Sequence, residues 1–170
     1  TKKESVHIPV VISKTGLEEC VYNDFHIGEG ADVLIVAGCG IHNGGDKKSR
    51  HDGIHTFYIG KNARVKYVEK HYGKGDGNGE NVMNPTTIVN IEEGGYMEME
   101  TVQIKGIDST NRITEAKLDK DAKIVITERI MTHGNQFAET HFNVDMNGDG
   151  SSANVISRSV AKGNSKQAFY

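Results

Sequence analysis

A short apolar pattern recurs five times along this chain and constrains its fold more than any other feature. Each copy contains an apolar anchor residue, a short turn and a second apolar segment. The anchors are separated by 32, 32, 27 and 28 positions, and they are Ile27, Ile59, Ile91, Leu118 and Met146. A period of a few tens of residues, with one supersecondary unit per repeat, is typical of solenoid proteins.

Side chains on both sides of each turn alternate between apolar and polar. In the second copy, the two alternating runs are residues 54–59 and 65–69, joined by a turn at residues 60–64. Phe57 and Ile59 share one face of the first run with His55. A period of two residues predicts a half-buried β-strand, with one face toward a dry interior and the other toward water.

Two strand arrangements are consistent with this pattern. The short turns could close antiparallel hairpins and produce a sandwich or barrel. They could instead carry the chain from one sheet to a facing sheet, so that equivalent strands stack in parallel from coil to coil. Stacking places equivalent side chains in register, and the matching anchor residues favour it. The sequence therefore predicts an all-β parallel β-helix, a solenoid of two-strand coils.

Composition narrows the class of protein. With 170 residues, the chain has the length of one domain with a buried core. A net charge of -3 gives no electrostatic indication of a nucleic-acid or anionic-membrane partner. Two cysteines, Cys20 and Cys39, are too few for a disulfide framework, so a reducing cytosol is the expected compartment.

Cys39 and His71 hold equivalent places in consecutive repeats, each twelve positions after its anchor. In stacked coils such positions lie about 4.8 Å apart, so the repeat predicts a thiol beside an imidazole. That pairing suits sulfur or soft-metal chemistry. The alternative, which spacing alone favours, is a buried cysteine that acts as a small apolar residue beside a hydrogen-bonded histidine.

Other histidines add candidates. His55 occupies an inward position that the other repeats fill with Asn23, Thr87, Thr114 and Phe142. Since buried polar groups need hydrogen-bond partners, this column is either a satisfied interior ladder or the lining of a functional site.

His42 and His51 flank the loop after Cys39, but their spacing matches no standard zinc site. Glu69 is predicted to point outward, although it precedes His71 and could assist it. The candidate metal ligands are His55, His71 and His42.

Several stretches share order and context with a known family. They are residues 34–39 (Leu-Ile-Val-Ala-Gly-Cys), His55, the five-fold repeat, and the closing run of residues 147–151, Ser157, 161–163 and 167–170. Together they resemble the core of the SufB/SufD scaffold family of iron–sulfur cluster assembly. The resemblance covers nearly all of residues 20–170.

The resemblance implies a right-handed parallel β-helix core. It also implies two partners, a SufC-type ATPase and a sister SufB/SufD scaffold or a second copy. Cys39 matches the core cysteine on the sulfur path of SufB, and His55 matches a histidine in the next strand. The glutamate that often stands two residues before this cysteine is Ala37 here. We expect residues 1–170 to be a single β-helix core domain that lacks the C-terminal helical ATPase-binding segment.

The resulting hypothesis is a cytoplasmic, non-enzymatic scaffold of the SUF machinery for a transient iron–sulfur cluster. Cys39 would accept or relay sulfur, with its thiol pKa lowered by a neighbouring imidazolium. His55 and His71 would tune or co-ligate iron. Two alternatives are a β-helix enzyme acting on polysaccharide and a purely structural interaction module.

Overall fold

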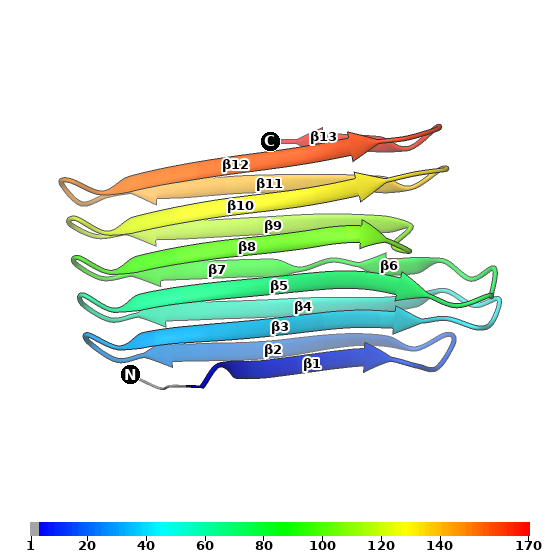
Figure 1. The fold of residues 1–170 in the computed structure, drawn as a ribbon, viewed down its shortest axis with the longest axis horizontal. Coiled ribbons are helices and arrows are strands. Elements are labelled where there is room, and N and C mark those ends of the chain that lie inside the picture. Colours follow the sequence, from blue (N-terminus) through cyan, green and yellow to red (C-terminus); the bar gives the residue numbers. More distant parts are fainter. Residues whose placement is uncertain (1–3) are drawn as a thin grey trace.

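The protein is a two-sheet β-solenoid. The computed structural model describes residues 4–170. All the regular secondary structure in that range is β-strand. One sheet, here called the front sheet, has the order β1-β3-β5-β8-β10-β12, and the other, the back sheet, has the order β13-β11-β9-β6-β4-β2, with β7 between β4 and β9 (Figure 1). The described part of the chain contains no helix long and apolar enough to span a membrane.

The strand bounds follow the predicted alternation. In the front sheet they are β1 Val6–Ile12, β3 Asp32–His42, β5 Arg64–Lys74, β8 Tyr96–Lys105, β10 Lys123–Thr132 and β12 Ser152–Ala161. In the back sheet they are β2 Glu18–Ile27, β4 Ser49–Ile59, β6 Asn81–Met83, β7 Thr86–Ile91, β9 Ser109–Leu118, β11 Phe137–Met146 and β13 Lys166–Phe169.

Every strand pair is parallel, which confirms the stacked-coil arrangement and excludes the hairpin alternative for the described residues. In Figure 1 the nearer strands run to the right and the farther strands return to the left as the chain climbs. This is a right-handed winding, the expected hand for crossovers between parallel strands. The five anchors pair directly with one another, from Ile27 with Ile59 to Leu118 with Met146.

Apolar side chains from both sheets fill the half of the interior near the short turns. Phe57 stacks on Phe25 with ring centroids 4.5 Å apart and packs against Tyr67 at 4.9 Å. Phe57 and Tyr67 are fully buried. The inward residues therefore form the core that the two-residue period predicts.

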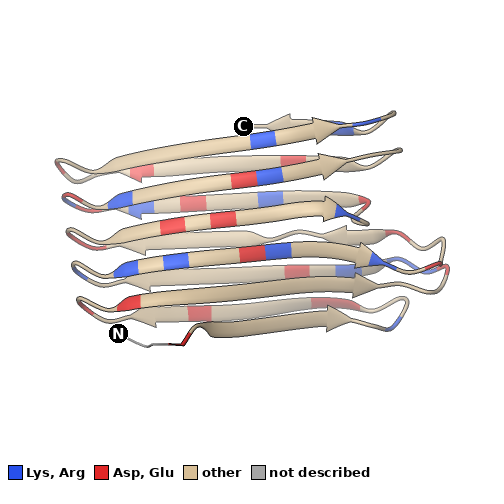
Figure 2. Cartoon of the chain, in the orientation of Figure 1, with Lys and Arg blue, Asp and Glu red and all other residues tan. Residues whose placement is uncertain are grey.

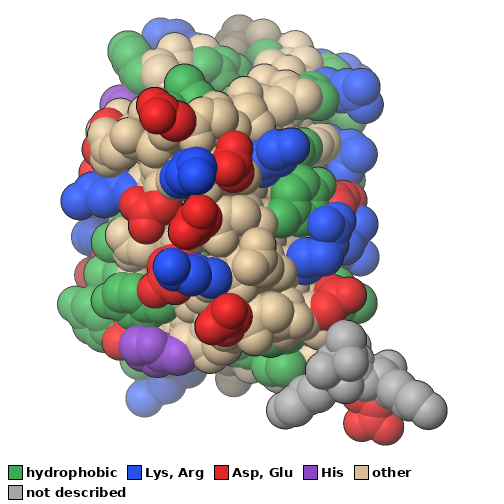
Figure 3. Space-filling view, turned by 90° about the vertical axis from the view of Figure 1, so that its left-hand side faces the viewer, with side chains coloured by type: hydrophobic (Ala, Val, Ile, Leu, Met, Phe, Trp, Pro, Cys, Tyr) green, Lys and Arg blue, Asp and Glu red, His purple; other side chains and the backbone are tan. Residues whose placement is uncertain are grey.

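The short turns stack into a regular column at the left of Figure 1. Asn62 and Asp121 adopt left-handed conformations there, as do Gly30, Gly94 and Gly150 at equivalent positions. Backbone hydrogen bonds join successive turns, such as Gly30 N to Lys61 O at 2.8 Å. Figure 3 views this end, where acidic and basic side chains mix, and its ion pairs include Lys61–Glu93 at 3.5 Å.

One irregularity interrupts the back sheet. Pro85 separates β6 from β7, because proline has no backbone N–H with which to continue the ladder. Its carbonyl still accepts a hydrogen bond from Ile113 N at 3.0 Å. The opposite half of the interior, near the long loops, differs from the apolar half in carrying buried polar and charged groups.

Candidate functional site: a buried polar network beside Cys39

Cys39 and His71 are neighbours inside the solenoid, as their equivalent offsets predict. They pair directly between β3 and β5, and both residues are buried. Cys39 belongs to a small apolar cluster that is separate from the main core. Its other buried members are Ile12, Ile41, Met83 and Ile107.

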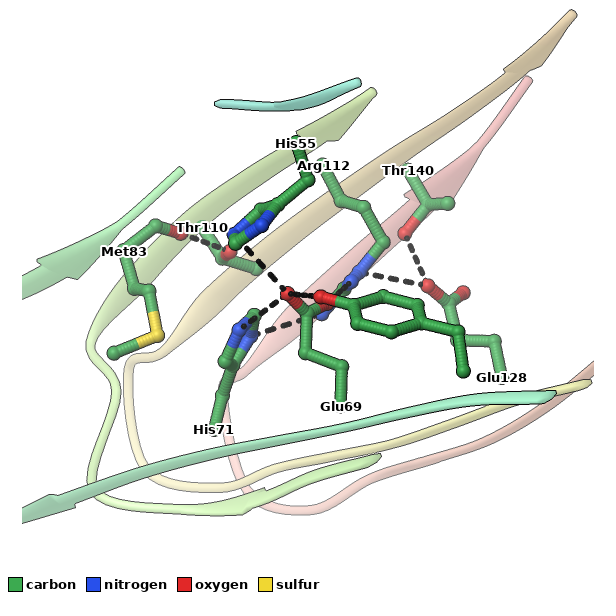
Figure 4. A network of polar contacts seen from close by, with 9 residues as sticks. His55, Glu69, His71, Met83, Thr110, Arg112, Glu128 and Thr140 are labelled. Carbon is green, nitrogen blue, oxygen red and sulfur yellow. Dashed lines mark hydrogen bonds and ion pairs between the residues drawn. The ribbon is translucent and has the colours of Figure 1, made fainter. Parts of the chain in front are cut away.

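Glu69 lies inside the solenoid, so its predicted outward orientation is wrong. It alternates with Tyr67 and His71 along β5, and this uninterrupted period of two carries all three side chains to the inner face. The Tyr67 hydroxyl donates to Glu69 Oε1 at 2.9 Å. His71 Nε2 lies 3.3 Å from the same oxygen (Figure 4).

Arg112 reaches across from β9 of the back sheet and joins these groups. Its Nη1 lies 2.9 Å from Glu69 Oε2, and its Nη2 lies 3.0 Å from His71 Nδ1. Its Nε lies 3.0 Å from Glu128 Oε2, a carboxylate on β10. One buried guanidinium thus bridges two buried carboxylates and an imidazole (Figure 4).

Hydroxyl groups complete the surroundings of Glu128. Ser157 Oγ donates to Glu128 Oε1 at 3.2 Å, and Thr140 Oγ1 donates to Oε2 at 3.4 Å. Nearby in the same interior, Thr110 donates to the backbone carbonyl of Met83 (Figure 4). The network therefore extends from His71 on β5 to Ser157 on β12, the last strand of the front sheet.

His55 faces the network from β4. Its Nε2 lies 3.9 Å from Glu69 Oε1, while its buried Nδ1 has no hydrogen-bond partner. The parity prediction is confirmed: His55 pairs with Asn23 on one side and Thr87 on the other. Unlike His71, whose two ring nitrogens are both engaged, His55 retains a nitrogen for a further interaction.

His51 is a buried residue that the sequence placed only beside a loop. Its Nδ1 contacts Glu19 Oε1 at 2.9 Å. Gly53 separates it from His55 along the inner face of β4 and leaves room for both rings. A Cβ at Gly53 would lie 3.0 Å from His55 Nε2 and 3.4 Å from His51 Nε2. The two Nε2 atoms therefore converge above this glycine.

His42 is separated from the other candidates. It is exposed at the end of β3, on the opposite parity to Cys39. Within residues 4–170, no group of three or more His, Cys, Asp and Glu side chains is arranged to hold a metal ion. The structure thus brings together Cys39, His71 and His55 but not His42.

Burial and charge set the protonation of the network. Burial raises the pKa of Glu69, but the contacts with His71 and Arg112 outweigh it and hold that pKa well below its usual range. Burial lowers the pKa of both His71 and His55. Because Arg112 donates to His71 Nδ1, the ring is neutral with its proton on Nε2. Burial raises the pKa of Glu128 despite Arg112.

The protonation state of the Cys39 thiol differs from the predicted one. Burial raises its pKa to about 12, and the Glu69 carboxylate contributes in the same direction. The neighbouring imidazole is neutral, so it provides no positive charge to stabilise a thiolate. The predicted lowering of this pKa by an imidazolium is therefore wrong for the chain by itself.

Thiol labelling checks this assignment. At pH 8 we expect the native protein to react with Ellman's reagent at the exposed Cys20 and to react at both thiols only after unfolding in urea. A pKa rise from 9.0 to about 12 lowers the Cys39 thiolate fraction roughly a thousand-fold. Cys20→Ser and Cys39→Ser assign the two phases. Equal labelling rates for both native thiols would contradict the buried, protonated state.

Arg112 and Glu128 were not predicted as site residues from the sequence, although the repeat contains a signal for them. Arg112 has the inward parity of Thr114, and Glu128 has the inward parity of Ile126. A charged residue at a position where the repeat requires an inward side chain indicates a buried ion pair. Their pairing could not be read from the sequence, because they lie on facing sheets.

The fold and this interior define a parallel β-solenoid with a polar network beside a buried thiol. Residues 16–170 match the family model described as "SUF system FeS cluster assembly, SufBD core domain". The chain belongs to this SufBD family.

Two curated relatives agree with this assignment. An iron–sulfur cluster assembly SufBD family protein of Archaeoglobus fulgidus is 27% identical over 161 residues, which cover 93% of this chain and 42% of the relative. Another, from Methanocaldococcus jannaschii, is 28% identical over 165 residues, which cover 96% of this chain and 51% of the relative. The chain therefore spans about half the length of the curated relatives it matches. No solved structure matches it significantly.

Proposed function

We propose that this chain forms a non-enzymatic β-solenoid scaffold of the SUF machinery in which Cys39 accepts or relays sulfur. The observation that carries the proposal is the position of a buried thiol directly beside a polar interior in a SufBD family chain. A structural module would be filled with apolar residues at less cost, because buried charges are expensive unless fully paired.

Several buried polar atoms near the network have no hydrogen-bond partner. They support a role in which the interior binds or transfers a polar species. His55 Nδ1, Thr101 Oγ1, Gln103 Oε1 and Thr114 Oγ1 are buried and lack hydrogen-bond partners. Buried polar atoms are almost always paired in folded proteins. Gln103 on β8 pairs in register with His71, which in turn pairs with Cys39, so this unpartnered oxygen lies two strands from the thiol.

The sulfur step is a thiol–persulfide exchange. The Cys39 thiolate attacks the terminal sulfur of a donor persulfide, the donor's S–S bond breaks, and the donor leaves as a thiolate. Cys39 becomes a persulfide, with no net oxidation or reduction. Because burial keeps Cys39 protonated, we propose that docking of the donor protein hydrates this end of the solenoid and permits deprotonation.

The histidines would have unequal roles toward iron, which is cargo here. His55 has a free ring nitrogen and would contribute one ligand, whereas His71 would orient Glu69 and Arg112. The remaining ligands would come from a partner, since the described residues form no complete site. In this proposal the partners are a sister scaffold or a second copy and a SufC-type ATPase.

Cluster reconstitution tests the sulfur role. In the assembled complex, we expect Cys39→Ser to abolish iron–sulfur cluster formation, measured by visible absorption, while circular dichroism shows an unchanged fold. Cys20→Ser is the matched control and should assemble clusters normally, because Cys20 is exposed and lies outside the network. Normal reconstitution by Cys39→Ser would show that the sulfur role is wrong and would leave a structural module as the better account.

A further inference from the structure

A row of exposed apolar side chains crosses the outer face of the front sheet near its long loops. One residue from each of β1, β5, β8, β10 and β12 contributes to it. These residues and their exposed fractions are Val11 55%, Tyr72 47%, Ile104 51%, Met131 42% and Val160 55%. We call this row the apolar ridge.

Strand register makes the ridge continuous. Val11 pairs with Gly40, Gly40 pairs with Tyr72, and Met131 pairs with Val160. Ile104 lies at the register shift between β5 and β8. At Gly40 the row has no side chain of its own, and the Tyr72 ring occupies that position instead. Six strands at about 4.8 Å spacing give the ridge a length of roughly 24 Å.

Basic side chains flank the ridge on both sides. The exposed cations next to it are Lys70, Lys74, Lys105, Arg158 and Lys162. Within the described chain, none of these five forms an ion pair, whereas other cations of the same sheet do, such as Lys66 with Glu98 at 3.0 Å. Figure 2 shows basic positions on the nearer strands toward the right, around the strand ends that carry the ridge.

One end of the ridge opens into a hollow. Met131 and Val160 line a groove of about 590 Å³ together with His133, Gly134, Lys162 and Gly163. Single exposed apolar residues are ordinary on protein surfaces. A continuous row that ends in a groove and is bordered by unpaired charge of one sign is instead typical of an interaction site.

We propose that the apolar ridge binds an acidic amphipathic α-helix of a partner protein. An α-helix rises 5.4 Å per turn, close to the spacing of the strands, so successive apolar positions on one helix face can follow the ridge. About 16 helical residues match its length. Glu and Asp on the helix flanks would pair with the lysines and arginines on either side. The proposal does not depend on Cys39 or on the sulfur step.

The shape of this surface favours a helix over a lipid bilayer. The ridge is one side chain wide, whereas interfacial membrane binding uses a broad apolar face. A second copy offers no matching acidic stripe on the same face, because the front sheet's Glu98 and Glu100 already pair with Lys66.

Peptide binding tests the proposal directly. The probe is a fluorescein-labelled peptide of about 18 residues with leucines on one helical face and glutamates beside them, and its control is a scrambled peptide of equal composition. By fluorescence anisotropy, we expect the amphipathic peptide to bind about ten-fold more tightly than the scrambled one. Ile104→Ser/Met131→Ser should weaken binding about ten-fold, and Lys74→Glu/Lys105→Glu should weaken it and reduce its salt dependence.

The control substitution removes exposed apolar surface from elsewhere on the same sheet. Leu34→Ser changes an exposed residue of β3 outside the ridge and should leave peptide affinity unchanged. Equal binding of both peptides, or binding insensitive to the ridge substitutions, would overturn the proposal. So would ridge-dependent binding to phosphatidylglycerol vesicles in place of the peptide, or ridge-dependent dimerisation in sedimentation velocity without it.

Discussion

Arg112→Met should lower the free energy of unfolding by about 3–5 kcal/mol at pH 7, measured by urea denaturation. The substitution retains much of the side-chain volume but removes the only cation between Glu69 and Glu128 among the described residues. The two buried carboxylates would then lose the guanidinium that balances their charge. An uncompensated buried charge costs far more than the net contribution of the pair that it replaces.

The pH dependence of this loss follows from the carboxylate pKa values. In the wild-type protein, Glu69 has a pKa well below its usual value, so its contribution to stability is present above pH 4.5 and is lost as the pH falls through the folded-state pKa. Without Arg112, the folded-state pKa of Glu69 rises, because one of the groups that lower it is lost while the effect of burial remains. The difference between Arg112→Met and wild type should therefore be largest near pH 7 and should shrink toward pH 4.

Two further variants separate charge from packing. Arg129→Met removes a half-exposed arginine that lies 3.7 Å from Glu100 Oε2 and should cost less than about 1 kcal/mol. Adding Glu69→Gln and Glu128→Gln to Arg112→Met should restore at least half of the lost stability, because both carboxylates of the network would be gone. If Arg112→Met were no more destabilising than Arg129→Met, the buried network would not be essential to the fold.

Gly73→Ala should cost about 3 kcal/mol in the same urea experiment. The stacked loops approach each other closely here, and a methyl group on Gly73 would overlap the backbone carbonyl group of Gly106. Gly106 has a φ of 75°, a left-handed conformation that other residues rarely adopt, so the backbone cannot easily move away. Because both sides of the contact are backbone, no flexible side chain can move to relieve the overlap.

Gly38→Ala is the matched control. Gly38 lies on β3, which pairs with β5, the strand that carries Gly73. A Cβ on Gly38 would meet nothing within 4 Å. Alanine also reduces the entropy of the unfolded chain, so the expected change is within about 1 kcal/mol and toward greater stability. Equal effects at the two glycines would mean that backbone entropy, and not the close contact of the loops, controls the result.

The repeat alone was sufficient to predict much of the site. Parity and offset placed Cys39 beside His71 and put His55 on the inner face, because register in stacked coils is a property of the sequence. Glu69 was misassigned because its parity was counted wrongly: it lies two positions before His71 and therefore shares the inner face. Its partner, Arg112, is 43 residues away in the chain.

The amino-acid sequence by itself determined the period, the inward and outward faces and therefore the parallel solenoid, because these depend on local alternation and on equivalent residues recurring at equivalent offsets. Only the tertiary structure decided which inward charges meet. Arg112 contacts Glu69 and His71 across the interior between the two sheets. Whether these side chains meet depends on how the coils stack on one another. The same packing excludes water from Cys39 and keeps its thiol protonated, which no spacing of residues could indicate.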